Sequence, residues 1–212
     1  MKLAVFGATG KTGVHLVRQA LEQGHQVTAV VRDPSRLPVE HDRLEVVTAD
    51  ITSADALLPV VKAQDAVLSA LGARGNEQAG IVSRACRAIL KAMEEGGTKR
   101  LLVVSAAPVG PSPEGDGFIV RFLLTPLVRR AFAPQYADLT VMEEDVLTTS
   151  GVEWTIVRPP RLLEGAASGT YRRSLDGNVP NGTSLDRADL ARALLDAVTD
   201  RETFGRVMGV AR

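Results

Sequence analysis

The sequence has little that would favour a secreted, membrane-spanning or nucleic-acid-binding protein. Among its 212 residues there is one cysteine, Cys86, so an internal disulfide is excluded. The 25 basic and 25 acidic residues give a formal net charge of +0, and no broad positive surface favours nucleic acid or an anionic membrane. The most apolar segment, FIVRFLLTPLVRRAF, is broken by three arginines and a proline, whereas a bilayer span needs roughly 18 to 20 apolar residues. No leader pattern opens the chain, and we expect a cytoplasmic protein.

Short β-branched runs alternate with longer helical patterns along the first half of the chain. Nearly continuous apolar strands separated by amphipathic helices indicate strands covered on both faces, and therefore a parallel sheet. We expect an α/β Rossmann-type doubly wound fold, with a mainly parallel sheet of six or seven strands, helices on both faces and a single domain over 1–212. The expected strands are 2–6, 26–31, 44–49, 65–70, 100–105 and the later runs WTIVRPP and RVMGV, with two short extended pieces around YRRSL and NGTSL. The expected helices are 11–23, 53–62, 76–95, about 135–149 and one opened by Asp186 as its N-cap.

The glycine-rich stretch GATGKTG follows the first expected strand and opens the first helix, where backbone N–H groups are unpaired and the helix dipole is positive. An anion fits there. Gly7 permits the sharp turn, Gly10 lets a pyrophosphate approach, and Gly13 lets the helix pack on the sheet. The other side chains that can add hydroxyl donors or charge are Thr9, Thr12 and Lys11. The alternative is a tight turn without a ligand. A nucleotide triphosphate loop is disfavoured, because its motif places four residues between the first glycine and Gly-Lys-Ser/Thr, whereas two separate Gly7 from Gly10-Lys11-Thr12.

The end of the second strand reads VVRDPSRLP and bears on which dinucleotide fits. Arg32, Ser35 and Arg36 can surround a 2′ phosphate, so the sequence predicts NADP(H) in preference to NAD(H). Asp33 keeps NAD(H) open as the alternative, because an acidic residue here can accept from ribose hydroxyls; it can also cap the turn or form a salt bridge.

The ends of the third, fourth and fifth strands supply further candidates. Asp50 and Ile51 can flank an adenine, or act as a helix cap and a core residue. Leu71 and Gly72 lie where the chain can pass beneath the ribose and nicotinamide, although Gly72 can equally be a simple turn. Ser105 is the best polar candidate beside a hydride-transfer face, where its hydroxyl could donate to an acceptor; the alternative is a strand-end cap.

Several of these motifs, in this order and spacing, resemble the atypical short-chain dehydrogenase/reductases: GATGKTG, VVRDPSRLP, QDAVLSALG, VVSAA and SGVEWTIVRPP. Within them the chain is most similar to the NmrA-like, NAD(P)H-binding group that includes NADPH-flavin reductase, also known as biliverdin-IX-beta reductase. The resemblance implies NADP along the carboxyl edge of the sheet, with a substrate pocket over the nicotinamide. It places on the pyrophosphate Gly7, Thr9, Gly10, Lys11, Thr12 and Gly13; on the 2′ phosphate Arg32 and Arg36; along the adenine and ribose Asp50, Ile51, Leu71, Gly72 and Arg74; and around the nicotinamide Ser105, Ala106, Pro159 and Pro160.

Two departures from the family limit what the resemblance implies. Typical short-chain dehydrogenases use Tyr-x-x-x-Lys, but this chain has Thr140 four residues after Tyr136, so Tyr136 is either a catalytic residue acting without lysine or a packing residue. The flavin reductase relatives carry histidine after the double proline, where this chain has Arg161. Arg161 can hold an anionic substrate or bridge to Glu164.

Two segments are expected to shape the substrate side. The insertion 107–134 is longer than in the flavin reductase relatives and is interpreted as a lid, a dimer surface or another packed helix. The segment 159–185 is expected to lie beside the substrate.

The function favoured by these features is an NADPH-dependent reductase that transfers hydride to a planar conjugated acceptor such as a flavin or quinone. The alternative is an NmrA-like sensor that binds NADP(H) without turnover; a sugar-nucleotide epimerase would need the missing tyrosine and lysine. Expected partners are a small-molecule acceptor, with no nucleic acid or membrane, in a monomer or homodimer. No metal site is expected, because the three histidines lie far apart.

Overall fold

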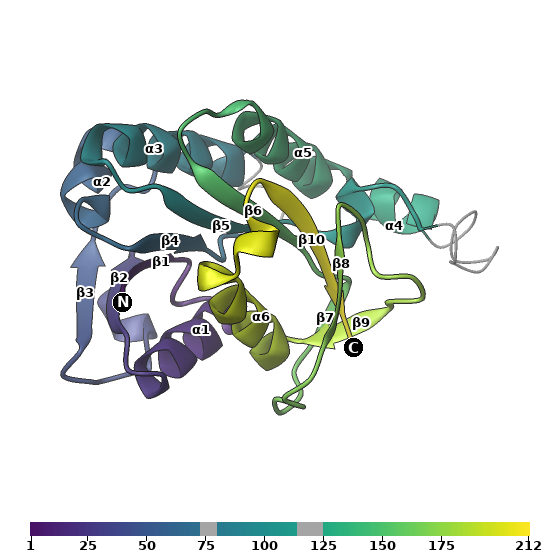
Figure 1. Cartoon of the computed structure of the whole chain (residues 1–212), viewed down its shortest axis with the longest axis horizontal. Coiled ribbons are helices and arrows are strands. Elements are labelled where there is room, and N and C mark those ends of the chain that lie inside the picture. Colours follow the sequence, from purple (N-terminus) through teal and green to yellow (C-terminus); the bar gives the residue numbers. More distant parts are fainter. Residues whose placement is uncertain (73–79, 114–124) are drawn as a thin grey trace.

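The computed structural model describes residues 1–72, 80–113 and 125–212. Its centre is an eight-stranded sheet in the order β3-β2-β1-β4-β5-β6-β10-β8, in which only β8 runs antiparallel to its neighbour (Figure 1). The strands are β1 Lys2–Phe6, β2 Gln26–Val31, β3 Leu44–Thr48, β4 Ala66–Ser69, β5 Arg100–Val104, β6 Glu153–Arg158, β8 Arg172–Leu175 and β10 Arg206–Ala211. The Rossmann-type, mainly parallel fold predicted from the sequence is confirmed.

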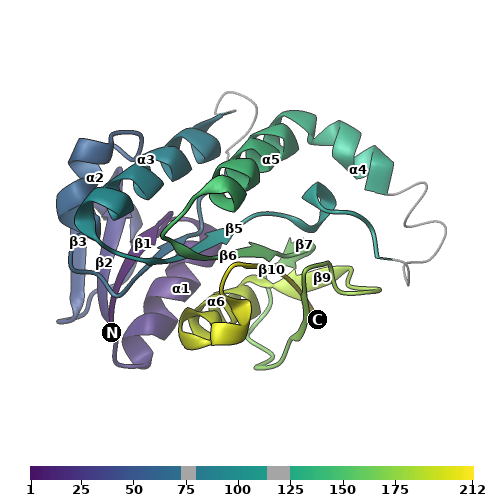
Figure 2. The ribbon, with the colours of Figure 1, turned by 45° about the horizontal axis from the view of Figure 1, so that its top comes forward.

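Helices cover both faces of the sheet, as Figure 2 shows. On one face lie α1 Lys11–Glu22 and α6 Arg187–Thr199, which pack against each other. The other face carries α2 Ala54–Val61, α3 Ile81–Gly96 and α5 Ala133–Thr148, with the short α4 Thr125–Ala131 before α5. Three short 3₁₀ turns complete the described helical elements: η1 Pro34–Arg36, η3 Ala107–Val109 and η5 Arg201–Thr203.

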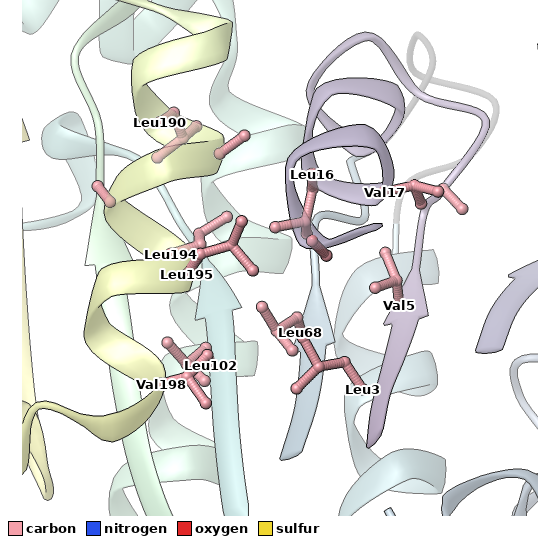
Figure 3. Close-up of a cluster of buried hydrophobic side chains, with 14 of the residues drawn as sticks. Leu3, Val5, Leu16, Val17, Leu68, Leu102, Leu190, Leu194, Leu195 and Val198 are labelled. Atoms are coloured by element: carbon pink, nitrogen blue, oxygen red, sulfur yellow. The ribbon is translucent and has the colours of Figure 1, made fainter. Parts of the chain in front are cut away.

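The two layers explain why the strands read as continuous apolar runs. Alternate residues of a strand face opposite sides of a sheet. In β1, Leu3 and Val5 belong to the core beneath α1 and α6, while Ala4 and Phe6 belong to the core beneath α2, α3 and α5. Figure 3 shows the first core, where residues of α1 and α6 meet residues of β1, β4 and β5.

The strand count differs from the prediction of six or seven. The eighth member, β8, is the antiparallel edge strand beside β10, and a separate two-stranded parallel sheet joins β7 Arg161–Leu163 to β9 Ser184–Asp186. These strands span three or four residues each and are polar or only half-buried over most of their length. Their sequences therefore lack the apolar run that identifies the inner strands.

The amino ends of the central strands are joined by a buried arginine. Arg100, at the start of β5, is 4% exposed and donates to the carbonyls of Glu153 and Val198 at 2.8 and 3.0 Å. It also donates to the hydroxyls of Thr155 and Thr203, and its guanidinium lies 4.0 Å from the centre of the Phe204 ring. Burial lowers the pKa of Arg100 to about 10, so it stays cationic at neutral pH. One side chain thus connects β5, β6, the end of α6 and η5.

In the part of the chain that the structure describes, none of the helices combines the length and the apolar character that crossing a membrane requires.

Candidate functional site

A cavity of about 680 Å³ lies at the carboxyl ends of β1, β4 and β5. This volume is within the usual range for small-molecule and cofactor sites, roughly 300 to 1,000 Å³. The carboxyl edge of a doubly wound sheet is also where such folds bind ligands. The lining residues are Thr9, Gly10, Lys11, Thr12, Arg36, Ala70, Leu71, Gly72, Val82, Val104, Ser105, Gln135, Leu139, Leu162 and Arg187.

The glycine loop has the backbone geometry expected of it. Gly7 has a φ of +76°, and a Cβ there would lie 2.7 Å from the carbonyl oxygen of Ala70. A Cβ on Gly13 would lie 2.0 Å from the carbonyl oxygen of Gly7, so only glycine lets α1 pack this closely on β1. Gly10, the N-cap of α1, donates to the Gly7 carbonyl at 2.8 Å and closes the turn.

The first turn of α1 is well suited to an anion. Gly10 offers no side-chain cap, and the turn contains no acidic residue. The backbone N–H groups at the start of a helix have no intrahelical partner, and the dipole there is positive. Thr9, Lys11 and Thr12 line the cavity next to these groups. The residues present therefore fit the diphosphate of a dinucleotide, although their role in binding it stays a prediction.

Lys11 has a partner that the sequence did not indicate. Its ammonium donates to Glu164 Oε1 at 2.8 Å, and Arg187 Nε donates to the same oxygen at 2.9 Å. Glu164 directly follows β7, while Arg187 is the first residue of α6. The hydrogen bond from Lys11 and that from Arg187 lower the pKa of Glu164 to about 2. Two cations of the cavity wall thus share one carboxylate.

Ser105 lies in the same cavity and has an unusual hydroxyl. The residue is 5% exposed, its backbone N–H donates to the carbonyl of Val157 at 2.8 Å, and its Oγ is buried without a hydrogen-bond partner among the described residues. The strand-end cap that the sequence left open is therefore not formed by this hydroxyl. A buried polar atom without a partner is costly, and a functional role is a frequent reason for its retention.

The opposite wall of the cavity is fixed by a buried carboxylate. Asp138 of α5, 5% exposed, accepts from the backbone N–H groups of Val82 and Ser83 at 3.0 Å each. These groups belong to the first turn of α3, so Asp138 caps a neighbouring helix. The contact holds Val82 of α3 and Leu139 of α5 in the cavity wall.

The corner after β2 presents two arginines to solvent. Arg32 and Arg36 are exposed, and neither guanidinium forms a hydrogen bond or ion pair within the described segments. Arg36 lines the cavity, whereas Arg32 lies outside its lining. Asp33 Oδ1 accepts from the N–H and hydroxyl of Ser35 at 3.1 and 2.7 Å, so it caps η1. The hydrogen bond from the Ser35 hydroxyl lowers the pKa of Asp33.

The candidates after β3 and β4 differ in their placement. Asp50 accepts from the backbone and hydroxyl of Thr52, which lowers its pKa, and Ile51 packs against the second core. Neither lines the cavity, whereas Leu71 and Gly72 do. Arg74 lies outside the residues that the structure describes.

Tyr136 is half-buried and packs edge-on against Phe132, with ring centres 6.1 Å apart. Burial raises its pKa, opposite to the lowering that a neighbouring lysine produces in typical short-chain dehydrogenases. Its neighbours Gln135 and Leu139 line the cavity, but Tyr136 does not. The packing interpretation therefore has the better support.

The structure does not form the bridge from Arg161 to Glu164 that the sequence left open; Glu164 Oε1 pairs with Lys11 and Arg187 instead. Arg161 is exposed and forms no ion pair with any residue in the described ranges. It precedes Leu162, which lines the cavity, and successive strand side chains alternate in direction. Arg161 is therefore directed away from the side on which Leu162 lies.

Ala106 and Pro159 stand where the insertion begins. The N–H of Ala107 donates to the carbonyl of Pro159 at 2.8 Å, and Asn178 donates to the carbonyls of Ala107 and Pro111 at 2.8 and 3.1 Å. The start of the insertion is thus fixed to the end of β6 and to the segment after β8. Ala106, Pro159 and Pro160 lie outside the cavity lining, and residues 114–124 of the predicted lid lie outside the described residues.

Within the described ranges no group of His, Cys, Asp or Glu residues is arranged to hold a metal ion. Cys86 is buried in α3, and burial raises the pKa of its thiol to about 12, so it is not a ready nucleophile.

Sequence reasoning missed several lining residues, of which Arg187 is the most polar. The sequence does carry a sign of Arg187. A helix is expected to begin just after Asp186, and an arginine in the first turn of a helix is unusual because the helix dipole is positive there. The apolar lining residues that were missed carry no such signal, because they read as core: Val82, Val104, Leu139 and Leu162.

Comparison with known proteins gives the family. The model of the NAD(P)H-binding family matches residues 7–201. YwnB of Bacillus subtilis is 28% identical over 208 residues, which cover 95% of this chain and 94% of YwnB. The oxidoreductase ylbE of Lactococcus lactis has the same fold, with a TM-score of 0.85 and 18% identity over 100% of this chain and 91% of that one. A Streptococcus pneumoniae protein assigned as an NADH-flavin reductase matches with a TM-score of 0.82 and 25% identity over 100% and 99%.

The match covers most of the chain and includes the glycine loop, the strand-end positions around the cavity and α6. The predicted resemblance to the atypical short-chain dehydrogenase/reductases, and the predicted class of NAD(P)H-binding oxidoreductase, are confirmed. The chain belongs to the NAD(P)H-binding family.

Proposed function

We propose that the protein is an NADPH-dependent reductase whose acceptor is a planar conjugated molecule such as a flavin or quinone. The observation that carries this proposal is the shared cavity of Ser105 and the first turn of α1. The Ser105 hydroxyl, buried without a hydrogen-bond partner in the described part of the chain, and a helix start without a side-chain cap line the same 680 Å³ space. The hydroxyl suits an acceptor that gains negative charge, and the helix start suits a diphosphate.

NADPH, when bound, supplies the hydride. The chain supplies position and polarity. The N–H groups of the first turn of α1 hold the diphosphate, and Arg36, with Arg32 beside it, holds the 2′ phosphate. The Ser105 hydroxyl donates to an oxygen or ring nitrogen of the acceptor as negative charge develops there. Solvent supplies the proton.

A conjugated acceptor is favoured because the described cavity lining contains no tyrosine and lysine pair for proton exchange with an alcohol. Tyr136 has no lysine partner, has a raised pKa and lies outside the cavity lining. Flavins and quinones accept hydride at an electron-poor ring, for which positioning is the main requirement. The Streptococcus pneumoniae relative assigned as an NADH-flavin reductase supports this acceptor class. That assignment names NADH, whereas Arg32 and Arg36 favour NADPH here.

The test is an assay of NADPH oxidation in the absence of oxygen, with flavin mononucleotide, riboflavin and menadione as acceptors. The loss of NADPH absorbance measures the rate. We expect saturable turnover with at least one acceptor, and a lower kcat/KM with NADH. Tight binding of NADPH with no oxidation of any acceptor would instead support the NmrA-like sensor. No binding of either dinucleotide would refute both functions.

A further inference from the structure

Glu164 is the one acidic side chain that pairs with cations of the cavity wall in the described part of the chain. Its Oε1 accepts from Lys11 at 2.8 Å and from Arg187 at 2.9 Å, and both cations line the cavity. Lys11 and Arg187 are the first residues of α1 and α6, two helices that pack against each other. The carboxylate therefore lies where two side-chain cations and two helix starts converge.

The backbone that carries Glu164 is held firmly while its side chain is accessible. A Cβ on Gly165 would lie 2.1 Å from Oδ1 of Asp186, so the chain after Glu164 packs tightly on the start of α6. Shortly after Glu164, the backbone N–H groups of Ser168 and Gly169 donate to the buried carboxylate of Asp189 at 3.1 Å. The Glu164 side chain itself is 55% exposed. Rotation about its own bonds can move the carboxylate without moving the backbone.

A carboxylate between two cations has the chemistry of a phosphate oxygen in the same place. The pKa of Glu164 is lowered to about 2 by the hydrogen bonds from Lys11 and Arg187, so this charge is present at every physiological pH. A diphosphate that reached Lys11 and Arg187 would meet a like charge unless Glu164 moved away.

The geometry points to Glu164 as an internal anion that occupies a diphosphate subsite formed by Lys11 and Arg187. When the diphosphate of the dinucleotide enters, it displaces the carboxylate and takes both cations. This inference rests on the proposed function, because it gives Arg187 a role in binding that cofactor. Displacement is feasible because exposed ion pairs are weak, and a diphosphate carries more charge than the single carboxylate that it replaces.

The direction of the change in dinucleotide affinity distinguishes displacement of Glu164 from the alternative, in which Glu164 stays and bridges Lys11 and Arg187. If Glu164 leaves, the Glu164→Gln substitution removes a competitor, and the dinucleotide binds more tightly. If Glu164 stays and closes the cavity by holding Lys11 to Arg187, the same substitution weakens binding.

The experiment is isothermal titration calorimetry at low ionic strength on the wild-type chain, Glu164→Gln and Arg187→Gln. Two titrants are used, NADPH and inorganic diphosphate. Glu202→Gln is the matched control, because Glu202 is also an exposed glutamate paired with an arginine, Arg173, and does not line the cavity. We expect Glu164→Gln to bind NADPH roughly 3-fold more tightly, as expected for release of an exposed pair, and Arg187→Gln to bind it more weakly by a similar factor. Glu202→Gln should match the wild type.

Unchanged or weaker NADPH binding by Glu164→Gln would overturn the inference while the proposed function stood. If the wild-type chain did not bind NADPH, the proposed NADPH-dependent function would fail, and the diphosphate titration would decide the inference separately. Tighter diphosphate binding by Glu164→Gln than by the wild type would then support it, and equal binding would refute it.

Discussion

The buried polar groups at the two ends of the central sheet differ in their hydrogen bonding. At the amino end, Arg100 is almost fully buried, and it donates to backbone carbonyls and threonine hydroxyls of three neighbouring segments. At the carboxyl end, the hydroxyl of Ser105 is equally buried but has no described partner, and the first turn of α1 has no side-chain cap. Arg100 is the first residue of β5 and Ser105 directly follows the last, so only about one strand length separates them.

This difference separates stability from function. Buried donors that are paired within the chain hold it together, whereas a buried donor that is unpaired contributes no such energy and is available to a ligand. We therefore expect substitutions at the amino end to change the free energy of unfolding and leave binding intact. Substitutions at the carboxyl end should do the reverse.

The largest expected effect is that of Arg100→Met. The substitution leaves the carbonyls of Glu153 and Val198 and the hydroxyls of Thr155 and Thr203 with fewer partners in a buried place, so we expect a loss of about 3 kcal/mol in the free energy of unfolding, measured by urea denaturation. The control is Arg192→Met, an exposed arginine near Asp196, which should cost at most about 0.5 kcal/mol. A loss of NADPH affinity in folded Arg100→Met would contradict the expectation that the amino end of the sheet contributes to stability and not to binding.

Next is Ser105→Ala, for which we expect kcat to fall about 10- to 100-fold with the best acceptor, because the donor to the developing negative charge is removed. The free energy of unfolding should stay within about 0.5 kcal/mol, since the hydroxyl has no hydrogen bond to lose among the described residues. Ser105→Thr keeps a hydroxyl and should recover part of the rate. Unchanged turnover in Ser105→Ala would leave Ser105 as a lining residue only.

A smaller effect is expected at the corner after β2. Arg36→Gln should weaken NADPH binding about 10-fold, as for loss of one charge-assisted contact to a phosphate, while NADH binding changes less than about twofold. Fluorescence titration of the bound reduced cofactor measures both affinities. Arg201→Gln, at the amino end of the sheet, is the control and should change neither. Equal losses for NADPH and NADH would contradict the assignment of Arg36 to the 2′ phosphate.

Much of the fold and part of the site follow from the sequence, because each rests on a local pattern. The apolar run of β1 and the spacing of Gly7 and Gly13 define a strand, a turn and a packed helix, and the structure has all three. Ser105 was identifiable because it directly follows an apolar strand. The short extended pieces expected around YRRSL and NGTSL coincide with β8 and overlap β9. No local pattern indicates that β8 joins the main sheet or that β9 pairs with β7, so the predicted number of strands is too low.

What could not be predicted depends on contacts between distant residues. Glu164 lies close to Arg161 in sequence, which suggested a local bridge, yet it pairs with Lys11 and Arg187, 153 and 23 positions away. Likewise Arg100 reads as an ordinary first residue of a strand, and only the fold shows that α6 and η5 cover it. Ion pairing across the sequence is set by topology, which periodicity does not specify.

The central claim is that the carboxyl end of the sheet, and not its amino end, binds the dinucleotide. Titration of the isotope-labelled chain with NADPH, followed by the amide signals in nuclear magnetic resonance, tests it most directly. We predict the largest shifts for Gly10, Thr12 and Ser105, with Arg100, Thr155 and Thr203 nearly unchanged. Shifts centred on Arg100 and Thr203, or no shifts at saturating NADPH, would contradict the claim.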